Sequence, residues 1–157
     1  MTDEDVRRIE SRIKEETLFH PVSEWHAPPG GREGRNVWGW HTAAPASGVI
    51  VDFGDAEKGL YQEVVDAFRI YDRIFKDCTV EISPARRLAI IDMIFDLGEA
   101  KFRKMYRFLN RVIHDDWKGA ALELRNTVWF IKAPGGRRER RIVREIEGGK
   151  SESPGRH

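Results

Sequence analysis

The chain has a single cysteine, Cys78, among its 157 residues. One cysteine excludes an intramolecular disulfide and a thiolate metal cluster. The chain also lacks an excess of charge of either sign: the net charge is +1. By itself this value indicates neither a nucleic-acid protein nor a membrane-surface protein. No apolar run is long enough to span a bilayer, and the acidic start lacks the basic residues and apolar core of a secretory signal. We therefore expect synthesis in the cytoplasm without a signal peptide and no stable membrane insertion.

The residues that are present are typical of a globular protein. Hydrophobic residues make up 40% of the chain and charged residues 34%, and this length can bury a sizeable core. We expect one domain over residues 1–149. The polar segment 150–157 lacks apolar anchors, and we expect it to be disordered.

The most apolar stretch predicts a buried helix over about residues 84–97. Ser83 can cap its N-terminus, Pro84 is tolerated in a first turn, and Gly98 suits the position just past a helix end. Because apolar residues occupy nearly every position between them, this helix should lie at the centre of the domain.

Two carboxylates, Asp92 and Asp96, interrupt that helix four residues apart and therefore share one face. A buried charge needs a partner or a wet cleft. We expect Asp92 to cap backbone groups or to pair with an arginine. For Asp96, a structural role and a place in a substrate groove remain open.

The rest of the chain divides into helical and β-rich parts. Capping residues and helical spacing of apolar residues predict the other helices: about 3–15, from Asp52 or Asp55 to about Lys76, 100–113, from Asp115 or Asp116 past Leu124, and 137–146. Prolines, glycines and short apolar runs predict strands and turns over residues 18–54. The sequence thus predicts an α+β fold: a small β-hairpin lobe (about 18–54), a larger all-helical lobe (about 1–17 and 55–149), and a long interlobe helix.

Two glutamates suggest acid chemistry near the end of the first helix. Glu15 lies at its C-terminal end, where the helix dipole favours a protonated carboxyl, and Glu24 follows across a turn. Two carboxyl groups flanking a bond are the minimal equipment for cleaving a glycoside. In a chain with 26 acidic residues, an ordinary surface helix is the commoner explanation of such a pair.

Several stretches, in order, resemble the lysozymes of the T-even bacteriophages and related endolysins (glycoside hydrolase family 24). Residues 86–99 resemble the family's central helix, R-x-A-L-x-x-M-V-F-N-L-G, and residues 116–124 its W-x-x-A-A-x-x-L helix. Trp129 with residues 136–142 is similar to the W…P-x-R…R-[VI] close. At the N-terminus, R-I-K-E at 12–15 resembles R-I-x-E, and H-P-V-S-E at 20–24 resembles K-P-Y-x-D. The resemblance covers roughly residues 5–149.

This resemblance implies a lysozyme-like fold and an endo-acting muramidase, which hydrolyses the β-1,4 bond between N-acetylmuramic acid and N-acetylglucosamine. It implies Glu15 as catalytic acid and Glu24 as second carboxylate, with inversion at the sugar. Glu33 is a rival for the second role. The family's threonine that holds the attacking water is missing here, and Asn36 is the nearest polar residue in register with it. No metal or organic cofactor is implied; the implied partner is bacterial peptidoglycan, reached after release or delivery by another factor, and we expect a monomer.

Aromatic residues replace two family glycines in the predicted strand. Trp38 and Trp40 alternate with Gly39, so both face one side of the strand. They could stack on sugars or form a core pair, and His41 beside them is expected to be structural.

The resemblance also assigns substrate-facing positions in the helical part. Asp96 stands where the family has an amide that faces the saccharide, and Phe95 could line the same groove or pack in the core. Arg137, or Arg138 if the gap falls differently, matches the arginine that pairs with the catalytic acid.

Two other functions compete with the enzyme. A catalytically impaired lysozyme fold could bind cell wall or a protein partner, because the active-site strand departs from the family pattern. The basic run that begins at Arg137 could contact nucleic acid, although the balanced charge argues against it.

Overall fold

The computed structural model describes residues 1–17, 19–26, 35–40, 42–43, 48, 50, 52–131 and 136–150; for residues 20–26, 35–38 and 42–43 it describes the backbone. The chain forms two compact units, residues 1–66 and 67–157. The boundary falls within helix α2 (Phe53–Phe75). Within the described ranges, no helix combines the length and the apolar character needed to cross a membrane.

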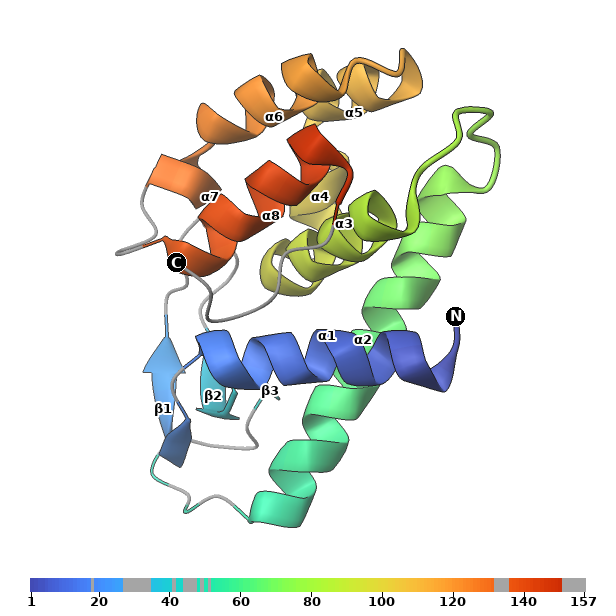
Figure 1. Cartoon of the computed structure of the whole chain (residues 1–157). Coiled ribbons are helices and arrows are strands. Elements are labelled where there is room, and N and C mark those ends of the chain that lie inside the picture. Colours follow the sequence, from blue (N-terminus) through green and yellow to red (C-terminus); the bar gives the residue numbers. More distant parts are fainter. Residues whose placement is uncertain are drawn as a thin grey trace. The chain divides into compact units, whose positions relative to one another are not determined.

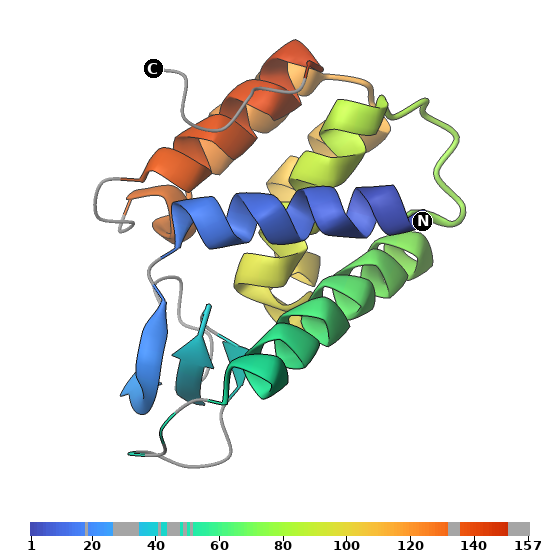
Figure 2. The same ribbon diagram turned by 60° about the horizontal axis from the view of Figure 1, so that its bottom comes forward.

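Unit 1 combines helix and sheet (Figure 1). Its elements are α1 (Asp3–Glu16), β1 (His20–His26), β2 (Arg35–Gly39), β3 (Thr42–Ala43) and the first part of α2. The strands form an antiparallel sheet in the order β1-β2-β3, seen from another side in Figure 2. Thr2 caps α1: its hydroxyl accepts from the Asp5 amide and the Asp5 carboxylate accepts from the Thr2 amide.

Unit 2 is helical (Figure 1). After the rest of α2 it contains α3 (Pro84–Leu97), α4 (Glu99–Arg103), α5 (Tyr106–Ile113), α6 (Trp117–Arg125), α7 (Val128–Ile131) and α8 (Arg137–Gly148). The predicted central helix is confirmed as α3, with Ser83 capping the Arg86 amide and Gly98 ending the helix at φ 78°. Consecutive residues Ala89 to Ile91 are fully buried, because α3 packs against both α8 and α4.

The predicted helix over 100–113 is wrong in one respect, because the structure has two helices there. Lys104 ends α4, and Met105 has a non-helical backbone at φ −80° and ψ 58° before α5 begins. Neither residue is a helix breaker by type, so the sequence pattern did not indicate the break.

The predicted α+β fold with a β-hairpin lobe is also wrong. The described chain is mostly helical, and its three strands have only seven, five and two residues. They belong to the same compact unit as α1 and do not form a lobe of their own. So small a sheet needs a helix to cover it. Gly39, at φ +55°, shows this packing: a Cβ there would lie 2.9 Å from the Ala56 Cβ on α2.

Candidate functional site

Glu15 lies in the last turn of α1, and its side chain is exposed. The helix ends at Glu16 because Thr17 adopts an extended backbone, at φ −124° and ψ 134°. The chain then enters β1 at His20. Solvent can therefore reach the Glu15 side chain.

The other two candidate catalytic residues lie on neighbouring strands of the same unit. Glu24 on β1 is opposite Val37, and Asn36 on β2 is opposite Trp25, so the two candidates are offset by one position in the ladder. An irregularity in the pairing falls between His20 and Glu24. Unit 1 thus holds all three predicted catalytic residues, and their roles stay predictions. Two further candidates, Glu33 and His41, lie outside the described residues.

A second pair of carboxylates in unit 1 surrounds Lys14, and the sequence reasoning missed it. The Lys14 Nζ lies 2.5 Å from Glu57 Oε1 and 4.7 Å from the centre of the Trp40 ring. Burial raises the pKa of Glu10; the nearby Lys14 charge opposes this shift and Glu57 adds to it. The spacing of Glu10 and Lys14, four apart on α1, was the available signal. The sequence alone could not show that Glu57, which lies on α2, is close to Lys14.

Trp40 belongs to the core of unit 1. Its side chain is 7% exposed, and its ring meets those of Phe19 and Phe53 edge-on, at centre distances of 5.0 and 5.6 Å. Of the two alternatives left open for Trp40, the structure supports core packing, because aromatic neighbours and Lys14 lie against the ring; its contact with a sugar stays a prediction. For Trp38 the structure gives the strand position, opposite Thr42 on β3, and its role in binding stays a prediction.

A buried charge network joins α3 to α8 in unit 2. Asp92, which is fully buried, accepts from Arg138 Nη2 at 2.9 Å and from Arg141 Nη2 at 3.0 Å. The Arg141 Nη1 also donates to Glu145 at 2.8 Å. The expectation that Asp92 pairs with an arginine is confirmed.

Asp96 continues this network at its more exposed end, with 19% of its side chain exposed. The Arg138 Nε donates to both carboxylate oxygens, at 3.1 and 3.2 Å. Burial raises the pKa of Asp96 to about 6; Arg138 opposes the shift, and Glu139 and Asp92 add to it. The Arg138 guanidinium also lies 6.0 Å from the centre of the half-buried Phe95 ring. These contacts give Asp96 and Phe95 structural roles, and their contact with substrate stays a prediction.

Of the two candidate arginines at the start of α8, Arg138 is buried and Arg137 is exposed. Which of the two pairs with Glu15, as the family resemblance implies, stays a prediction. Within the described ranges, no three His, Cys, Asp or Glu side chains are grouped so as to hold a metal ion.

Comparison with known proteins shows a similarity in sequence to a lysozyme. No family model matches the chain. Over 64 residues the chain is 30% identical to "Probable T4-type lysozyme 2" from Dictyostelium discoideum. These residues are 41% of this chain and 36% of that protein. The chain thus spans about a third of the length of the curated relative it matches. This similarity supports a lysozyme-like relationship.

Proposed function

We propose that the chain is a peptidoglycan hydrolase, a muramidase that cleaves the β-1,4 bond between N-acetylmuramic acid and N-acetylglucosamine. The observation that carries the proposal is the 30% identity to a probable T4-type lysozyme. The motifs quoted from the sequence agree with it, because they occur in the family's order. We further propose that the protein acts as a monomer and reaches the wall through another factor.

Glu15 is the proposed general acid. Its exposed position at the end of α1 suits a group that a polysaccharide must reach. A bound sugar would exclude water from the carboxyl, so that proton transfer to the leaving oxygen would occur in a site shielded from solvent. Glu24 would orient water or stabilise positive charge on the sugar.

Clearing of a suspension of purified cell walls tests the proposal. The wild type should clear it, and Glu15→Gln should lower the rate by roughly 10²-fold or more, the usual scale for loss of a general acid. Glu4→Gln is a matched control on the same helix, because the Glu4 side chain is 85% exposed and should keep wild-type activity. A Glu15→Gln protein that clears walls at the wild-type rate would remove Glu15 from the mechanism.

The competing class is a wall-binding module without turnover. Two tryptophans stand at glycine positions of the family pattern, and the burial of Trp40 shows that the local packing follows this change. If the wild type clears no wall but sediments with it, the module is the correct description. If it does neither, peptidoglycan is not the ligand.

A further inference from the structure

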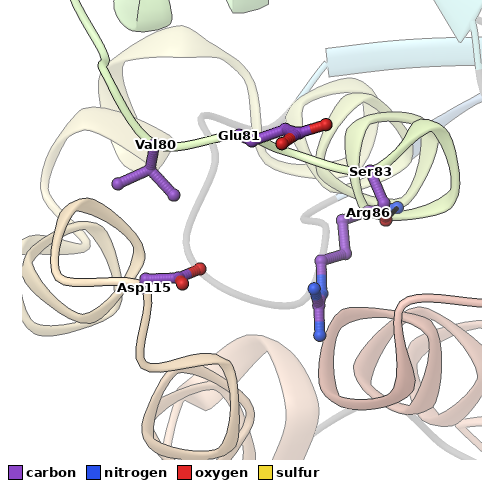
Figure 3. Close-up of a pocket in the computed structure, with 5 residues that line it drawn as sticks. All are labelled: Val80, Glu81, Ser83, Arg86 and Asp115. Carbon is purple, nitrogen blue, oxygen red and sulfur yellow. Dashed lines mark hydrogen bonds between the residues drawn. The ribbon is translucent and has the colours of Figure 1, made fainter.

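Unit 2 contains a pocket of about 370 Å³ that the proposed catalysis does not use. It is lined by Val80, Glu81, Ser83, Arg86 and Asp115. Figure 3 shows Arg86 and Asp115 on opposite sides of the opening. Charges of both signs therefore line one small volume.

The Arg86 guanidinium is held in a fixed position. Its Nε donates to the Ile146 carbonyl at 2.8 Å and its Nη2 to the Glu147 carbonyl at 3.1 Å, at the C-terminal end of α8. The guanidinium also lies 4.3 Å from the centre of the Trp117 ring. Its Nη1 donates no hydrogen bond within the described part of the chain. Because a guanidinium has five N–H donors in a rigid fork, donors remain for an incoming carboxylate.

Asp115 is held by the same indole. The Trp117 Nε1 donates to Asp115 Oδ1 at 2.6 Å, and Trp117 itself is buried. Asp115 adopts the left-handed region at φ 57°, the only non-glycine residue to do so among the described residues. Trp117 therefore orients an arginine with its ring face and a carboxylate with its N–H.

The two opposite charges do not meet each other. Among the described residues, Arg86 and Asp115 form no ion pair, although each lies within the electrostatic influence of the other. A guanidinium and a carboxylate kept apart across a pocket match a ligand that carries both complementary charges. Glu81, the second acid that lines the pocket, adds to the attraction for a positively charged group.

We propose that this pocket binds a small zwitterion of the amino-acid or short-peptide class, with its carboxylate on Arg86 and its ammonium group on Asp115. This site is separate from the proposed glycosidase chemistry and does not depend on it.

Titration of the full ¹⁵N-labelled chain with glycine and with glycylglycine tests the proposal, with the indole N–H signal of Trp117 as readout. At least one of the two should shift that signal in a saturable way. N-acetylglycylglycine lacks the ammonium group and glycylglycinamide lacks the carboxylate, so both should bind more weakly. Asp115→Asn should weaken zwitterion binding roughly tenfold or more, the scale of a lost charged hydrogen bond.

The Asp115→Asn variant should keep its fold, because asparagine also accepts from Trp117 and tolerates the left-handed region. Asp72→Asn removes an exposed acid of α2 that does not line the pocket, so it should bind as the wild type does. Absence of a saturable shift with either zwitterion would overturn the proposal. Equal binding of N-acetylglycylglycine, or unchanged binding by Asp115→Asn, would overturn it as well, because the pocket would then not recognise the ammonium group.

Discussion

Replacement of Asp92 by alanine should strongly destabilise the protein, because two buried arginines share this carboxylate. The side chains of Arg138 and Arg141 are 8% and 4% exposed, and Asp92 is fully buried. Removing one partner of a buried ion pair typically costs about 3–5 kcal/mol. Each arginine keeps another carboxylate, Asp96 for Arg138 and Glu145 for Arg141. We therefore expect the lower end of the range, about 3 kcal/mol.

Urea unfolding followed by circular dichroism measures this loss, provided that the slope with denaturant stays the same. The melting temperature should fall by roughly 6–12 °C for a chain of this size. Glu147→Ala is the control: it removes the partner of Arg125 in a pair at 2.8 Å whose side chains are 38% and 39% exposed, and it should cost less than about 1 kcal/mol. If Asp92→Ala costs no more than this control, the network does not hold α3 and α8 together.

Two further predictions concern Asp96 and Trp40. Because burial raises the pKa of Asp96 to about 6, the native state keeps a proton that the unfolded state has lost, and this group's contribution to stability falls as pH rises from about 4 to about 6. Asp96→Asn should remove that fall when free energies of unfolding are compared across the window, and an unchanged slope would show that Asp96 is not responsible. Trp40→Ala should cost about 3–5 kcal/mol, as for a large ring in a core, measured by urea unfolding; a cost below about 1 kcal/mol would place the ring on the surface.

The sequence predicted the helix ends well where a residue type has a local physical role. Ser83 and Thr2 cap their helices through short-range hydrogen bonds, and Gly98 takes a positive φ. Such signals depend on neighbours within about four residues, so they can be read without the fold. The break at Lys104 and Met105 carries no such signal, and only the backbone of the structure reveals it.

Side-chain environments were harder to predict than helix ends. Adjacent residues on a helix point about 100° apart, since a turn takes 3.6 residues, so one step separates the exposed Arg137 from the buried Arg138. The indole of Trp40 suits both a sugar platform and a core, and the choice depends on Phe53, which lies far along the sequence. The predicted β lobe failed for a related reason: strand signals over 18–54 were real but short, and they could not show that α1 belongs to the same unit.

These differences in environment separate stability from the proposed catalysis. In unit 2, Asp92 is fully buried and accepts hydrogen bonds from two arginines, so its loss should lower the free energy of unfolding. Glu15 in unit 1 is exposed, and an exposed carboxylate contributes little to the free energy of unfolding. A glutamine at position 15 should therefore unfold at nearly the same urea concentration as the wild type. Loss of wall clearing by that variant would then reflect chemistry at Glu15, because no change in folding accompanies it.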